Sequence, residues 1–160
     1  MAHVPNRTPI NITGHAHVAA AKLGLTSETL MYGLVRARRA NLYKDGLRLW
    51  YSNNNLIEKN EIIDSRDMVA WYAHKNIFRD NLGRRSRYSI HFMFANDNIV
   101  EGNQFYDNAV GVYFMYTEGG IARNNVISHA TGATGMGIGF KEASGTVIEN
   151  NEIIYCGIGI

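Results

Sequence analysis

The chain has 160 residues, of which 46% are apolar and 19% charged, and this is typical of one folded domain rather than a disordered or collagen-like chain. Its net charge of +2, from 16 basic and 14 acidic residues, lacks the excess needed for nonspecific binding to nucleic acid or a membrane surface. A single cysteine excludes an internal disulfide framework, and no apolar stretch approaches the roughly 20 residues of a membrane span.

The N-terminal part differs in composition from the rest. Residues 1–45 contain seven alanines, whereas 14 of the 16 isoleucines follow Asp45. We therefore divide the chain into an N-terminal segment, residues 1–45, and a domain, residues 46–160. The segment is expected to be irregular or to form a short amphipathic helix over residues 27–40, whose apolar side chains share one helical face. Residues 1–10 show no pattern of an export signal.

Five segments of the domain share the pattern apolar-x-x-Asn-x-apolar, with one exception at Gly83. Their asparagines are Asn60, Asn81, Asn103, Asn125 and Asn151. The intervals are 21, 22, 22 and 26 residues, and the last is long because an insertion lies near residues 131–134. A second set of segments alternates between inward and outward side chains in the same register, as strands do. These segments are residues 47–49, 68–70, 90–92, 112–114 and 138–140.

A period near 22 residues, with short apolar pieces joined by Asn, Asp and Gly turns, is typical of one coil of a parallel β-helix. Leucine-rich repeats have a similar period, but they would show a fixed leucine pattern, which is absent here. We predict an all-β fold, a right-handed single-stranded parallel β-helix of about five coils. The repeated asparagines should stack inward as a ladder of hydrogen-bonded amides. Two apolar ladders should fill the interior: Ile57, Phe78, Val100, Ala122 and Ile148, and Leu49, Ala70, Phe92, Phe114 and Phe140.

The first strand of each coil also predicts three outward columns. They are Arg48, Val69, His91, Tyr113 and Gly139; Trp50, Trp71, Met93, Met115 and Lys141; and Tyr51, Tyr72, Phe94, Tyr116 and Glu142. Outward Trp and Met side chains are unusual, because solvent-facing strand positions usually carry polar residues. We expect the N-terminal segment or another copy of the chain to cover this face. The open last coil is a second reason to expect a homo-oligomer.

These strands carry a family resemblance. Trp-Tyr, His-Phe-Met and Gly-Phe-Lys-Glu segments follow one another in order on successive coils. They belong to residues 48–52, 66–72, 91–94, 110–116 and 135–142. The series resembles the NosD family, the periplasmic proteins that help to mature the copper centre of nitrous oxide reductase. Members of that family are longer, so the chain is expected to be a piece of such a protein or a small relative.

The resemblance implies a right-handed parallel β-helix in the periplasm, although this chain shows no export signal. It implies a non-catalytic accessory role in copper and sulfur delivery to the reductase. The implied partners are the membrane subunits of an ABC transporter and a copper chaperone. No role with nucleic acid and no direct membrane span are expected.

The outward residues His91, Met93 and Met115 are a candidate site for transient binding of copper(I). Met93 and Met115 occupy the same position on adjacent coils, so their Cα atoms should lie about 4.8 Å apart. Thioether sulfur is a soft ligand that selects Cu(I) over zinc and magnesium. His91 lies two residues from Met93 on the same face and would supply a third ligand. The alternative is that the methionines only pack against Trp71, Tyr113 or a partner chain.

A carbohydrate-binding or carbohydrate-active β-helix, similar to a polysaccharide lyase or epimerase, is the alternative function. Trp50, Trp71, Tyr113 and Tyr116 would then form a platform on which sugars stack. Catalysis needs a base or paired carboxylates at the centre of that groove. The columns offer only Arg48 and the Lys141–Glu142 pair, near opposite ends, so we expect a ligand or partner face rather than an enzyme.

Overall fold

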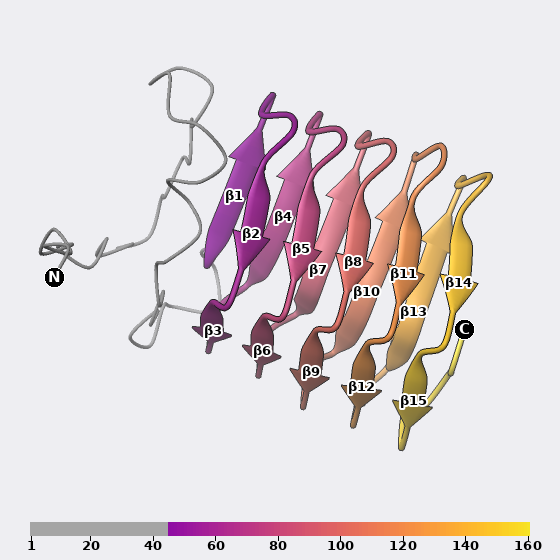
Figure 1. Cartoon of the computed structure of the whole chain (residues 1–160). Coiled ribbons are helices and arrows are strands. Elements are labelled where there is room, and N and C mark those ends of the chain that lie inside the picture. Colours follow the sequence, from indigo (N-terminus) through magenta and orange to yellow (C-terminus); the bar gives the residue numbers. More distant parts are fainter. Residues whose placement is uncertain (1–44) are drawn as a thin grey trace, which may run out of the picture.

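The computed structural model describes residues 45–160, which form a parallel β-helix (Figure 1). Sheet A contains the first strand of each coil: β1 (Leu47–Trp50), β4 (Asp67–Trp71), β7 (Tyr88–Met93), β10 (Val110–Met115) and β13 (Met136–Lys141). Neighbouring strands pair in parallel throughout. The predicted all-β solenoid of about five coils is therefore confirmed, and the predicted helix over residues 27–40 lies outside the described residues.

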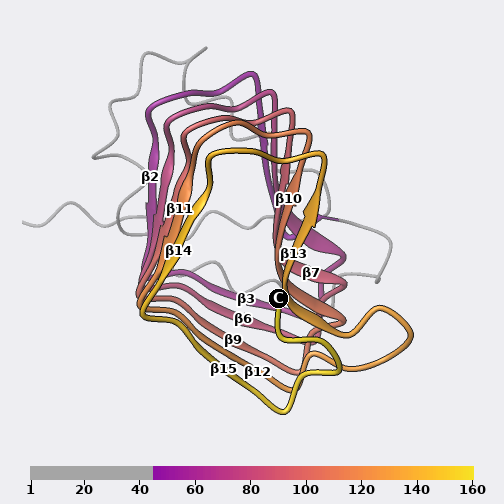
Figure 2. The same ribbon diagram turned by 90° about the vertical axis from the view of Figure 1, so that its right-hand side faces the viewer.

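Two further sheets complete each coil. Sheet B contains β2 (Leu56–Glu58), β5 (Ile77–Arg79), β8 (Ile99–Glu101), β11 (Ile121–Arg123) and β14 (Val147–Glu149). Sheet C contains β3 (Glu61–Ile63), β6 (Leu82–Arg84), β9 (Gln104–Tyr106), β12 (Val126–Ser128) and β15 (Glu152–Ile154). Viewed along the axis, the sheets form separate sides of the coil, and the loop of the insertion near residues 131–134 projects at the corner between sheets C and A (Figure 2).

The corners between strands depend on left-handed backbone conformations that recur on every coil. After sheet A, the left-handed residue is Tyr51, Tyr72, Phe94, Tyr116 or Glu142. Asp, Asn, Lys and Gly take the same role between sheets B and C: Lys59, Asp80, Gly102, Asn124 and Asn150. A left-handed residue other than glycine costs about 1–2 kcal/mol, so the aromatic corner requires compensating contacts.

The asparagine ladder between sheets B and C is present as predicted. Each Nδ2 donates to the Oδ1 of the next asparagine, from Asn60 to Asn81, from Asn81 to Asn103, and onward to Asn125 and Asn151, at 2.9–3.0 Å. Each Oδ1 also accepts from the backbone N–H of the preceding ladder residue. The ladder thereby satisfies the buried amides and fixes the register of the coils.

A second ladder lies at the corner between sheets A and B, and sequence analysis missed it. Asn55 Nδ2 donates to Asn76 Oδ1 at 2.8 Å, and Asn76 Nδ2 donates to Asn98 Oδ1 at 3.0 Å. These asparagines repeat with the same spacing of 21 and 22 residues as the first ladder. The ladder ends after three coils because Gly120 follows at this corner.

The two predicted apolar ladders fill the interior. Phe78, Phe92 and Phe114 are fully buried, and the rings of Phe92 and Phe114 stack with centroids 5.1 Å apart. Phe140 stacks on Phe114 and Ile148 packs against the core, as predicted, but both belong to the last coil described, where Phe140 is exposed and Ile148 is half-buried. The core is therefore a continuous apolar column along the axis.

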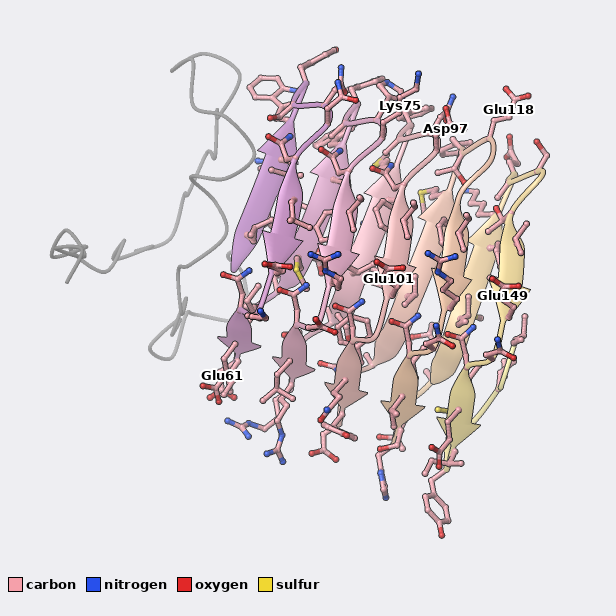
Figure 3. The ribbon with its side chains drawn as sticks, viewed as in Figure 1. Glu61, Lys75, Asp97, Glu101, Glu118 and Glu149 are labelled. Atoms are coloured by element: carbon pink, nitrogen blue, oxygen red, sulfur yellow. The ribbon has the colours of Figure 1, made fainter. Side chains whose placement is uncertain are left out.

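The outer surface of sheet B carries an alternating row of charges. Arg79 Nε donates to Glu58 Oε2 at 2.9 Å, and Arg123 Nε donates to Glu101 Oε2 at 2.9 Å. Glu101 and Glu149 project from this face in Figure 3. Like charges on adjacent strands are destabilising, so the alternation favours this register over a shifted one.

Candidate functional site

The candidate site lies on the outer face of sheet A, where the pairing of strands confirms the predicted columns. The strand register joins Val69 to His91, His91 to Tyr113, and Tyr113 to Gly139. The next column runs through Trp50, Trp71, Met93, Met115 and Lys141. The predicted residues of the face thus lie together on sheet A or, for Tyr116 and Glu142, at the corner that follows it.

Met93 and Met115 are direct partners on adjacent strands β7 and β10. Both are half-buried, with Trp71 on one side of the pair and Lys141 on the other. Adjacent strands place their Cα atoms about 4.8 Å apart, within the reach of two flexible thioethers that converge on one ion. The register therefore supplies the pair of soft donors that the sequence predicts.

His91 occupies the predicted column but is only 8% exposed. The ring of Tyr88 lies 4.8 Å from its imidazole, and the ring of Tyr113 lies 5.9 Å away, between centroids. Its Nε2 is enclosed and has no hydrogen-bond partner. Burial is the main cause that lowers the pKa of His91. The negative charge of Asp67 raises this pKa, whereas the positive charge of Arg87 lowers it further. The neutral imidazole, the form that binds metals, is therefore favoured.

This burial makes the stability of the chain depend on pH. An unfolded histidine has a pKa near 6.5, so below about pH 6.5 the unfolded chain takes up a proton here that the folded chain resists. We expect the free energy of unfolding of the metal-free chain to fall with decreasing pH in this range, and to fall less in His91→Phe. Urea denaturation at a series of pH values measures both slopes. Equal slopes would show that His91 makes no contribution.

A ladder of stacked aromatic rings borders the methionine pair. Ring centroids lie 4.9 Å apart between Tyr51 and Tyr72, 5.1 Å between Tyr72 and Phe94, and 4.8 Å between Phe94 and Tyr116. The planes are within 8–11° of parallel. Each stacked pair contributes about 0.5–1.5 kcal/mol beyond its buried area, which offsets the left-handed backbone at these positions.

Contacts of the aromatic rings also test the sugar-stacking platform, which belongs to the alternative carbohydrate function. Tyr116 has Phe94 against one face, and the Lys141 Nζ lies 5.2 Å from its ring centroid. The Arg48 guanidinium lies 5.2 Å from the ring centroid of Trp71. Stacking on a sugar needs an open ring face, and these contacts occupy ring faces of Tyr116 and Trp71. The carbohydrate function stays a prediction that this geometry does not favour.

Sequence analysis missed two residues of the face, Tyr88 and Met136. Tyr88 is hidden because the pairing of β4 with β7 shifts register between Asp67 and Val69, so one extra residue enters coil three. Met136 follows the insertion, and its Sδ lies 3.0 Å from the position that a Cβ on Gly139 would occupy. Met136 could be recognised as an outward side chain only once the register across the insertion was known.

Polar nitrogens without partners gather on this face. Trp71 Nε1 and His91 Nε2 are buried and make no hydrogen bond, whereas Arg48 Nε, which also makes none, lies 3.6 Å from Asp45 Oδ2 in an ion pair. Each unsatisfied buried group costs about 1–3 kcal/mol. Within residues 45–160, no three His, Cys, Asp or Glu side chains are arranged to hold a metal ion. The site of His91, Met93 and Met115 depends on thioethers and stays a prediction.

Fold and face together define a parallel β-helix protein of the solenoid repeat class, with soft sulfur donors on the outer face of one sheet. The family model described as periplasmic copper-binding protein (NosD) matches residues 26–160. The chain therefore belongs to the NosD family. No curated protein and no solved structure gives a significant match. Among the described residues, no helix is long and apolar enough to cross a membrane.

Proposed function

We propose that this chain is a periplasmic accessory protein that binds Cu(I) for the maturation of the copper centre of nitrous oxide reductase. Its family is described as periplasmic and copper-binding, which supports both the location and the metal. A membrane ABC transporter and a copper chaperone are its proposed partners, and the transfer of copper between proteins is its proposed role.

The observation that carries this proposal is the pair of methionines on the outer face of sheet A. Met93 and Met115 are Cα partners, and they lie in the outward column rather than in the core. Their thioethers are soft, uncharged donors that suit Cu(I). His91, next to them on β7, is the third donor, and its burial keeps the imidazole neutral and ready to bind. An ion held at an exposed face is accessible for transfer to a partner.

A competition titration with a Cu(I) chelator under anaerobic conditions tests the proposal. We expect the wild-type chain to bind Cu(I) at least tenfold more tightly than Met93→Leu/Met115→Leu, because both thioethers are lost while the side-chain volume changes little. His91→Ala should weaken binding further.

Met68→Leu is the matched control, because Met68 is buried inside the coil with 1% exposure and cannot reach the outer face. It should bind Cu(I) as the wild type does. If the wild type binds Cu(I) no more tightly than Met93→Leu/Met115→Leu, the proposed site does not exist.

A further inference from the structure

We infer that Tyr88 determines which metal ions reach His91, because its ring covers the imidazole and lets it join only an ion that Met93 and Met115 already hold. This inference rests on the proposed function and assigns a metal selectivity to the same site. It follows from the way in which the chain itself fills the space around His91 on the outer face of sheet A.

Two tyrosine rings enclose the imidazole of His91. The ring centroid of Tyr88 lies 4.8 Å from that of His91, and the ring centroid of Tyr113 lies 5.9 Å from it. The two tyrosine rings also pack against each other, with centroids 5.4 Å apart. His91 is left with 8% exposure, and its Nε2 is enclosed. We call Tyr88 and Tyr113 the tyrosine cover.

Both rings of the tyrosine cover are held in place by further contacts. The Arg87 guanidinium lies 4.7 Å from the ring centroid of Tyr88, a cation–π contact. Arg87 Nε in turn donates to the buried Asp67 Oδ1 at 3.0 Å. The Tyr113 ring occupies the space over Gly139, where an added Cβ would lie 2.6 Å from the ring atom Cδ2. The cover is therefore fixed by a buried ion pair on one side and by a missing side chain on the other.

The tyrosine cover separates two kinds of donor. Met93 and Met115 are half-buried, whereas His91 is buried. Zn²⁺ is bound in proteins by Cys, His, Asp and Glu, and of the three donors of the site only His91 belongs to this set. Cu(I) is a soft ion that thioethers bind. An ion that needs the imidazole first is therefore kept out, and one that binds the methionines first is admitted.

The position of His91 on β7 explains how it joins a held ion. It lies two residues from Met93 on the same face, so an ion on the methionines has a high effective concentration beside the imidazole that a free ion lacks. The bond to the imidazole then offsets the displacement of the Tyr88 ring, since a ligand shifts an equilibrium by its differential affinity for the two states. His91 Nε2 makes no hydrogen bond, so none has to break.

The reaction of His91 with diethyl pyrocarbonate, followed by mass spectrometry of peptides from the full chain, tests the tyrosine cover without metal. We expect His91 to react at least tenfold more slowly than the exposed His129, because it reacts only through local opening. Tyr88→Ala, or Tyr88→Leu if the alanine variant does not fold, should remove most of this difference. Tyr88→Phe keeps the ring and should protect His91 as the wild type does. Tyr106→Ala is the matched control, because Tyr106 lies on sheet C of the same coil.

Nuclear magnetic resonance of the His91 imidazole nitrogens tests the selectivity at this residue alone. In the wild type, Cu(I) under anaerobic conditions should shift these signals, and excess Zn²⁺ should leave them unchanged. In Tyr88→Ala both ions should shift them. In Met93→Leu/Met115→Leu, which keeps the cover and loses the thioethers, neither ion should do so.

The outcomes separate this inference from the proposed function. Equal reactivity of His91 in the wild type and in Tyr88→Ala would show that Tyr88 is no cover. A shift of the wild-type His91 signals by Zn²⁺ would show that Tyr88 does not select. Either result overturns this inference and leaves Cu(I) binding by the methionines intact. A wild-type chain that binds no Cu(I) in the chelator titration would overturn the proposed function, and this inference with it.

Discussion

Asn103→Ala is expected to lower the free energy of unfolding by about 3–5 kcal/mol, because it removes the centre of the asparagine ladder. The Asn103 Nδ2 donates to the carbonyls of Phe78 and Glu101 at 2.9 and 3.1 Å, and to Asn125 Oδ1. Its Oδ1 accepts from the backbone N–H and the Nδ2 of Asn81, both at 2.9 Å. Alanine leaves several of these groups buried and without partners, and each costs about 1–3 kcal/mol.

Urea denaturation followed by circular dichroism measures this loss. Asn124→Gly is the matched control, because Asn124 is exposed, adjacent in the chain to the ladder residue Asn125, and in a left-handed conformation that glycine adopts readily. Its cost should stay below about 1 kcal/mol. A loss below about 1 kcal/mol for Asn103→Ala would show that the ladder adds little to stability.

The repeat made the fold predictable from the sequence. Because side chains alternate along a strand and the coil repeats every 21 or 22 residues before the insertion, one correct register places the predicted inward and outward columns. Asn60 and its equivalents define that register. The ladder of Asn55, Asn76 and Asn98 has the same spacing, but it covers only three coils and stops at Gly120, so it leaves a weaker repeat in the sequence.

The candidate site was predictable only in part. The adjacency of Met93 and Met115 follows from register alone, and the structure confirms it. The burial of His91 does not follow from register alone, because it depends on Tyr88. The register shift between β4 and β7 places Tyr88 on the outer face. Contacts that arise from a single irregular coil leave no periodic pattern in the sequence.

The methionine pair and the irregular coil together explain why this face differs from the other two. Sheet B presents an alternating row of glutamate and arginine that satisfies itself along the axis. Sheet A presents aromatic and sulfur side chains, and some of its buried nitrogens have no partner. The charged row is complete within one chain, whereas the buried Trp71 Nε1 and His91 Nε2 have no hydrogen-bond partner within it. We therefore expect the binding function on sheet A.

Gly111→Ala is expected to lower the free energy of unfolding by about 3 kcal/mol or more, at the upper end of the cost of overpacking a core. A Cβ at this position would lie 2.3 Å from the carbonyl oxygen of Gly137 on the next coil and 2.5 Å from Ile127 Cγ2. The first contact is with backbone, so it is relieved only if β10 and β13 separate. Gly159→Ala is the control, because nothing lies within 4 Å of its added Cβ, and it should be nearly neutral. Thermal unfolding compares the two variants, and equal melting temperatures would contradict the close approach of coils four and five at Gly111.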